Sequence, residues 1–168
     1  MITVLDACCA INLHNAGLFG TLLTVPEATW AIGPRALEEC RDECPDLSRS
    51  IVSGRVQMLD DQNISAALYL DLLARHGLGD GETECIAFAT LDITARIATD
   101  DRRARRISVG LFSKTRVTGS LGLLRDCVMA RLLSSSEAYS GYVAMVQRGG
   151  FLPVINDDFF IPPPQAAS

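Results

Sequence analysis

Short apolar runs that end abruptly at acids or turn residues mark the predicted strands of this chain. The run Ile2–Leu5 is nearly continuous and stops at Asp6, a pattern typical of a strand buried on both faces of a parallel sheet. Further strands are predicted at Ala28–Ile32, Arg96–Thr99 and Thr115–Thr118.

Helical periodicity fills the intervals between these strands. After Asn63, which we expect to be the N-cap, Leu68, Leu72 and Leu73 recur at helical spacing until Gly77 ends the pattern. Either core burial or contact with a second copy or a partner peptide accounts for this apolar face. Helices are predicted from about residue 9, over 18–23, from 34 to about 43, over 63–76 and 82–91, through 108, and over 121–132 and 137–147.

Alternating strands and helices predict an α/β protein with helices on both faces of an open parallel sheet. With 168 residues, 48 % of them hydrophobic, the chain has material for one core. We expect one domain over residues 1–161 and a disordered tail over 162–168, where prolines and small residues cannot pack. Ligands of such sheets bind at the carboxyl ends of the strands, beside the topological switch point.

The composition predicts a cytoplasmic protein outside the membrane. No apolar run approaches the roughly 20 residues of a membrane span, and no basic start of a signal peptide is present. The 6 cysteines are expected to be reduced and mostly buried. Cys40 and Cys44 share a helix face, but no second pair completes a tetrahedral metal site.

Six carboxylates follow predicted strands or lie in the first turns of the adjoining helices. Gathered at one sheet edge, acids from distant positions repel one another and raise each other's pKa unless a cation lies between them. We therefore predict a metal site. The six are Asp6, Glu38, Glu39, Glu82, Asp100 and Asp101.

Ordinary capping is the alternative explanation for each acid taken singly, because acids favour helix N-termini. Glu82 extends a helical stripe with Ile86, Ala89 and Ile93 that should face the sheet. Glu84 lies on a neighbouring stripe, so periodicity alone does not choose between the two glutamates.

The ligand type favours Mg²⁺ or Mn²⁺ over Zn²⁺, because the donors are hard oxygens without a nearby histidine. His14 is expected at the surface and His76 at a helix end. Without a histidine base, deprotonation of an attacking water falls to the metal.

An arginine cluster directly follows Asp100 and Asp101. Cations in the first turn of a helix oppose its dipole, so an anionic partner is expected. Either Arg102 or Arg105 is a counter-ion of the acids, and the rest grip a phosphodiester backbone. The cluster consists of Arg102, Arg103, Arg105 and Arg106.

Further residues are predicted to extend the arginine cluster into a basic track along the surface. Arg96, Lys114 and Arg116 are candidates, and the backbone N–H groups at Gly119 and Ser120 offer a phosphate site at the start of the next helix. The net charge of −5 argues against a surface that attracts nucleic acid everywhere, but it permits a local track.

Five stretches, taken in order, resemble the signatures of PIN-domain proteins, especially a bacterial and archaeal branch. The resemblance covers about residues 2–132 and continues more weakly to Phe151. The stretches are Val4-Leu5-Asp6 with Ile11-Asn12-Leu13, Ile32-Gly33-Pro34 with Leu37-Glu38-Glu39, residues 78–87 (LGDGETECIA), residues 99–105 (TDDRRAR) and residues 118–124 (TGSLGLL).

This resemblance implies a Rossmann-like α/β/α sandwich with a parallel sheet of order 3-2-1-4-5. It also implies divalent-metal-dependent phosphodiester cleavage, usually of RNA, often by the toxin of a toxin–antitoxin pair. The expected partners are RNA, with DNA left open as a substrate, an antitoxin protein and a second copy in a homodimer.

Carried over by position, four acids match those of the family. They are Asp6, Glu39 or its neighbour Glu38, Glu82, and Asp101 or its neighbour Asp100. The hypothesis is a ribonuclease in which these acids hold one or two metals. Arg102, Arg103 and Arg106 would position the RNA backbone.

Two other functions compete with this hypothesis. In a receiver-type or phosphoryl-transfer domain, Asp6 would be the nucleophile and Lys114 its charge partner, but Cys8 stands where a second Asp is usual. In a non-catalytic binding module, the same scaffold would leave the acids without a catalytic role.

Overall fold

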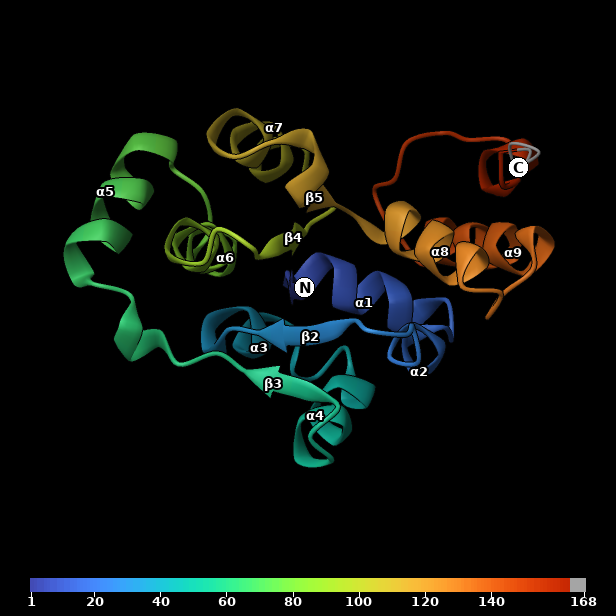
Figure 1. Ribbon diagram of the computed structural model, residues 1–168, viewed down its shortest axis with the longest axis horizontal. Coiled ribbons are helices and arrows are strands. Elements are labelled where there is room, and N and C mark those ends of the chain that lie inside the picture. The colour runs from blue at the N-terminus through green and yellow to red at the C-terminus, as the bar shows by residue number, and fades with distance from the viewer. Residues whose placement is uncertain (164–168) are drawn as a thin grey trace.

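A parallel sheet of five strands, in the order β3-β2-β1-β4-β5, forms the centre of the protein (Figure 1). The computed structural model describes residues 1–163, so most of the tail predicted over 162–168 lies outside the described residues. The α/β class and the strand order 3-2-1-4-5 are confirmed. The strands are β1 (Ile2–Leu5), β2 (Thr29–Ile32), β3 (Val56–Met58), β4 (Arg96–Ala98) and β5 (Val117–Thr118).

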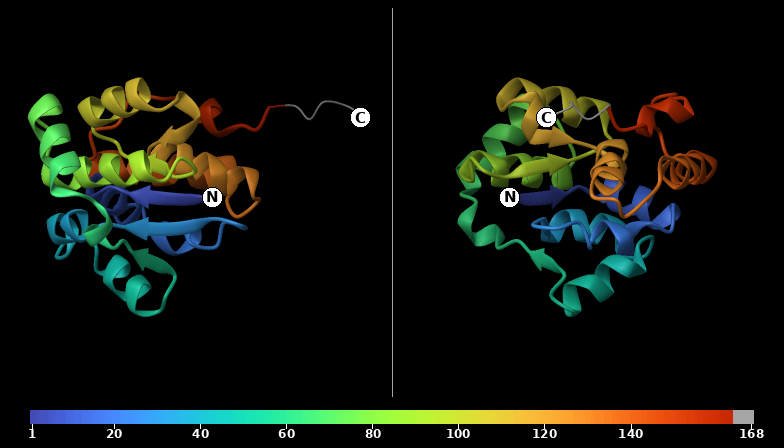
Figure 2. Two further views of the ribbon diagram at one scale, coloured as in Figure 1. Left: turned by 60° about the vertical axis from the view of Figure 1, so that its left-hand side comes forward. Right: turned by 45° about the vertical axis from the view of Figure 1, so that its right-hand side comes forward.

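Helices cover both faces of the sheet, and the β1 and β2 arrows point the same way in Figure 2. Leu5 and Ala98 point into a core with α1, α8 and α9, whereas Val4 and Ile97 point into a core with α6. The α-helices are α1 (Ala7–Asn15), α2 (Phe19–Leu22), α3 (Pro34–Cys40), α4 (Pro45–Val52), α5 (Ala66–His76), α6 (Asp80–Leu91), α7 (Arg102–Leu111), α8 (Ser120–Met129) and α9 (Ser135–Gln147). Short 3₁₀ helices are η1 (Asp61–Asn63), η2 (Lys114–Arg116) and η3 (Asp157–Phe160).

Among the strands and α-helices, α4 and β3 escaped the sequence prediction. Of the three residues in β3 only Val56 is buried, so no apolar run marks this edge strand. The N-cap of α5 is Ser65, whose hydroxyl accepts the Leu68 N–H, while Asn63 ends the preceding 3₁₀ turn. The proposed cap at Asn63 was therefore wrong by two positions.

Helix α5 is only shallowly buried. Leu72 is its one buried residue, and Leu70 is 59 % exposed. Core burial therefore accounts for only part of the apolar pattern predicted there. Ile93 is also exposed, since it lies in the turn after α6, so the stripe containing Glu82 ends at Ala89.

Five of the cysteines, all but Cys8, are buried free thiols, as the composition predicted. The Cys40 and Cys44 thiols donate hydrogen bonds to the carbonyls of Ala36 and Ala10, which agrees with a packing role. Over residues 1–163, no helix is both long enough and apolar enough to cross a lipid bilayer.

The order of the strands brings Asp6 and the acids after β4 together. Strands β1 and β4 pair in parallel, with Leu5 opposite Ala98, and the Asp6 N–H donates to the Ala98 carbonyl at 2.9 Å. From β1 the chain adds β2 and β3 on one side of the sheet and then β4 and β5 on the other, so the topological switch point lies between β1 and β4. The predicted switch point and the first acids therefore coincide.

Candidate functional site

Asp6 is a rigidly held, buried carboxylate at the start of α1. Its side chain caps the helix by accepting the Ala7 N–H at 2.9 Å. The other oxygen accepts the Thr99 hydroxyl at 2.7 Å and the Cys8 thiol at 2.9 Å. Burial raises the pKa of Asp6, the hydrogen bonds lower it, and the Glu39 carboxylate raises it further.

Thr99 and Cys8 were not among the predicted site residues. Thr99 is the buried residue directly after β4, and its hydroxyl also accepts the Asp101 N–H at 3.2 Å. The Cys8 thiol accepts the Asp100 N–H at 3.2 Å. The sequence feature that could have predicted Thr99 is its position, because it is a polar residue at the end of a buried strand that lies next to a strand ending in an acid.

Glu39, Glu82 and Asp101 approach Asp6 from three further elements. Burial raises the pKa of Glu82, and the carboxylates of Asp6, Glu39 and Asp101 raise it further. Glu39 on α3 accepts the Gly81 N–H at 3.0 Å, which fixes it beside α6. Of the pair left open by the sequence, Glu39 and not Glu38 is thus the one placed among the acids.

Asp101 and Asp100 have different surroundings. Asp101 is the N-cap of α7 and accepts the Ala104 N–H at 2.6 Å through one oxygen. The Asp100 carboxylate accepts the Ser120 N–H at 2.8 Å, the Ser120 hydroxyl, and the Asn12 amide at 2.8 Å. Asp100 therefore joins α1 to the start of α8.

This contact overturns the predicted phosphate site at Ser120. The Ser120 side chain is buried, and both its N–H and its hydroxyl are already engaged by Asp100. A side-chain carboxylate thus occupies the helix N-terminus that was expected to receive a phosphate.

Glu84 serves the fold of the neighbouring helix. Its side chain is 1 % exposed, and one oxygen accepts the Arg35 N–H at 3.1 Å at the start of α3. A Cβ at Gly33 would lie 1.8 Å from that oxygen, so the approach requires glycine. Between the two glutamates left open by periodicity, Glu82 is the one near Asp6.

The arginines of α7 make no direct ion pair with these acids within residues 1–163, so the counter-ion role of Arg102 or Arg105 stays a prediction. Arg103 donates to the His76 carbonyl at 2.6 Å, and Arg105 donates to the Thr99 carbonyl at 3.4 Å. Arg102 is exposed and borders the cleft beside Asp101, and Arg106 is exposed on the same helix.

The predicted extension of the basic track through Arg96 and Arg116 was also wrong. Arg96 pairs with Asp126 at 2.6 Å, and Arg116 donates to three backbone carbonyls, including that of Ala95 at 2.8 Å. These residues and Lys114 lie before or at the amino ends of β4 and β5, opposite the edge that carries Asp6. The same placement removes Lys114 as a charge partner of Asp6, so the receiver-type alternative lacks the cation that was expected for it.

A cleft of about 690 Å³ opens beside the acid cluster. Glu82, Asp100, Asp101 and Arg102 line it, together with Asn12 and Cys8 from α1 and residues 149–151 from the segment after α9. The cleft therefore places anionic groups and a free arginine side by side.

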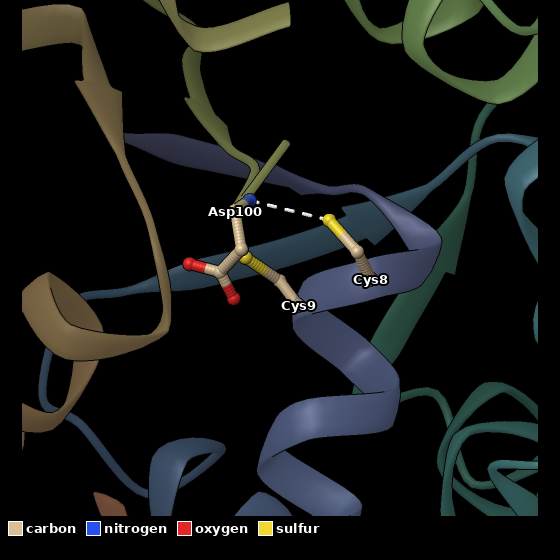
Figure 3. Close-up of side chains that lie close together, drawn as sticks. All are labelled: Cys8, Cys9 and Asp100. Atoms are coloured by element: carbon tan, nitrogen blue, oxygen red, sulfur yellow. Dashed lines mark hydrogen bonds between the residues drawn. The ribbon is translucent and has the colours of Figure 1, made fainter. Parts of the chain in front are cut away.

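Cys8, Cys9 and Asp100 form the one group with metal-ligand spacing among the described residues, their ligand atoms lying within 4.8 Å of one another (Figure 3). Burial raises the pKa of the Cys9 thiol well above its ordinary value, which keeps the thiol protonated and a poor ligand. This group is therefore better explained as packing at the start of α1.

The four other carboxylates fit a hard divalent cation. Asp6, Glu39, Glu82 and Asp101 come from four elements and have no ion-pair partner among the described residues. The carboxylates of the other three raise the pKa of Glu82, and that of Glu39 raises the pKa of Asp6. No three of their ligand atoms all lie within 4.8 Å of one another. An all-oxygen donor set of this kind suits Mg²⁺ or Mn²⁺.

Comparison with protein families agrees with this geometry. A family model described as a PIN domain matches residues 2–153, nearly the whole described chain. This protein belongs to the PIN-domain family. No curated protein and no solved structure gave a match to the sequence.

Membership gives the site its general chemistry. PIN domains are generally nucleases and typically use divalent metals. The carboxylate cluster at the switch point of this PIN domain is the candidate site for such a metal among the described residues.

Proposed function

We propose that this PIN domain is a Mg²⁺- or Mn²⁺-dependent ribonuclease. The observation that carries the proposal is the convergence of Asp6, Glu39, Glu82 and Asp101 without a cationic partner in the described chain. Keeping four acids together in this way is unfavourable unless cations bind there.

A divalent cation, when bound, supplies an activated water and stabilises the charge that develops on the phosphate and the leaving oxygen. The chain provides the positioning. Thr99, Cys8 and Ala7 hold the Asp6 carboxylate in one orientation, and the Gly81 N–H does the same for Glu39. Preorganised ligands of this kind need no rearrangement when substrate arrives.

Arg102 is placed to bind the substrate backbone. It is exposed, borders the cleft and follows Asp101 directly, so its guanidinium can reach a phosphodiester oxygen near the acids. Arg106 lies one turn further along the exposed face of α7 and extends this contact. Arg103 and Arg105, which bind backbone carbonyls, are assigned to holding the site together.

The resemblance further suggests that the protein is the toxin of a toxin–antitoxin pair and that it forms homodimers. Support within the chain comes from α5, which leaves Leu70 largely exposed and Leu68 and Leu73 only partly buried. Light scattering of the purified protein tests the dimer. A small reading frame beside its gene whose product binds the protein and blocks cleavage tests the antitoxin.

Cleavage assays with the purified protein test the proposed activity. With Mn²⁺ or Mg²⁺ the protein should cleave single-stranded RNA, and EDTA should stop it. Asp6→Asn should lower the rate by roughly 100-fold or more, the scale on which loss of one preorganised charge stabiliser acts. Asp71→Asn, on the exposed face of α5, is the matched control and should cleave normally. Cleavage that is insensitive to EDTA, or equal in the Asp6 variant, would contradict the proposal.

A further inference from the structure

The segment after α9 returns to the cleft in a fixed position. Gly149 ends the helix with a φ of 94°, a left-handed conformation that favours glycine. A Cβ at Gly150 would lie 2.7 Å from Asn12 Oδ1 and 2.9 Å from the Met145 carbonyl. Only glycine allows this approach, which sets the backbone beside the Asn12 amide that binds Asp100.

Contacts beyond the cleft hold the same segment. Leu152 packs against the main core. The Tyr142 hydroxyl donates to the Pro153 carbonyl at 3.2 Å and accepts the Ile155 N–H at 3.4 Å. The backbone on both sides of Phe151 is therefore anchored.

The Phe151 side chain itself is exposed to solvent. Its side chain is 89 % exposed, although it lines the same cleft as Glu82, Asp101 and Arg102. An aromatic ring gains free energy when it is covered, and an anchored backbone loses little entropy when a ligand covers the ring. The exposed ring therefore has the properties of a preformed contact.

We infer that Phe151 stacks on one unpaired base of the nucleic acid whose phosphodiester lies at the carboxylates, an inference that rests on the proposed nuclease function. Every base has a π-face, so such stacking tolerates any sequence. A base within a duplex has its faces covered by its neighbours, so the contact selects single-stranded substrate.

The surroundings of the ring favour a base over an apolar protein surface. Most side chains that share the cleft are polar or charged, including Asn12, Glu82, Asp101 and Arg102. Arg102 complements the phosphates on either side of a stacked base. An apolar protein surface that covered the ring would instead contact the charged carboxylates beside it.

Steady-state cleavage of a short single-stranded RNA tests the inference. Phe151→Ala should raise KM by roughly 10-fold and leave kcat within about threefold, because stacking contributes to binding. Phe151→Tyr should restore KM. Val154→Ala is the control, since Val154 is 95 % exposed on the same segment and does not line the cleft.

A matched series of RNAs, each abasic at one position, separates stacking from other contacts. At the position that meets Phe151, removing the base should raise the KM of the wild-type protein as much as Phe151→Ala does, and the two changes together should add little. An unchanged KM in Phe151→Ala, or losses that add in full at every position, would overturn the inference while leaving the nuclease function intact. An unchanged KM with loss of binding to a protein partner would assign the ring to that partner. Absence of metal-dependent cleavage by the wild-type protein would overturn both.

Discussion

At the scale of single residues, Asp6 is a carboxylate that the fold buries and orients without pairing it with a cation. The side chain is 2 % exposed, and its hydrogen bonds come from Ala7, Cys8 and Thr99. These bonds lower its pKa, but burial outweighs them and raises it. The ionised form is therefore unfavourable in the metal-free fold, and a cation would relieve this cost.

The raised pKa values of Asp6 and Glu82 predict a pH effect on the metal-free protein. A raised pKa means that the folded state binds protons more tightly than the unfolded chain. The protonated carboxyl groups therefore stabilise the folded state. This stabilisation is complete at pH values below the ordinary pKa, 3.8 for Asp6 and 4.5 for Glu82, and is lost as pH rises through the raised pKa of each group. Urea unfolding in EDTA should show this loss in the wild-type protein.

Asp6→Asn isolates the contribution of that residue. An amide can keep the Ala7 contact without carrying charge, so the stability of the variant relative to the wild type should increase as pH rises above 3.8. Saturating Mn²⁺ should reduce this advantage by stabilising the wild type more than the variant. A constant difference across pH would show that Asp6 ionisation is not linked to folding.

At the scale of elements, carboxylates from one segment complete the helix start of another. Glu84 on α6 binds the first turn of α3, and Asp100 after β4 binds the first turn of α8. Asp6 and Asp101 cap their own helices. Backbone N–H groups thus hold Asp6, Glu39, Asp100 and Asp101 in place, and of these four Asp100 serves the start of α8.

Ser120→Ala tests the structural role given to the start of α8. Loss of the hydroxyl removes one of the hydrogen bonds to Asp100 and should cost about 1 kcal/mol of unfolding free energy. Since the side chain is buried away from substrate, KM for RNA should change little. Unfolding curves and cleavage kinetics of the same variant check both statements. A large rise in KM at unchanged stability would return Ser120 to phosphate binding.

Most elements could be predicted from the sequence, because the runs around β1, β2 and β4 are apolar and end in acids or turns. The strand order was instead an implication of the family resemblance. Strand β3 could not be predicted, since only Val56 is buried in it. The arginine roles could not either. They depend on which carbonyl or acid lies near each guanidinium, as with Arg116, which donates to carbonyls from α6 and the turn that follows it.

At the scale of the whole molecule, the sheet order is what makes the site. Placing β1 beside β4 brings Asp6 to Thr99 and Asp101, while α3 and α6 carry Glu39 and Glu82 to the same edge. The segment after α9 then closes one side of the cleft with Phe151. Residues more than a hundred positions apart therefore meet in one anionic cleft with an arginine at its border.

Calorimetric titration of the metal-free protein with Mn²⁺ at neutral pH tests the central claim that the four carboxylates are a cation site. The wild-type protein should bind one or two ions. Asp6→Asn should weaken binding at least about 10- to 100-fold, the loss typical of a metal site whose supporting groups are changed. Asp71→Asn should bind as the wild type does. Absence of binding at millimolar Mn²⁺, or equal binding by the Asp6 variant, would contradict the claim and favour a non-catalytic module.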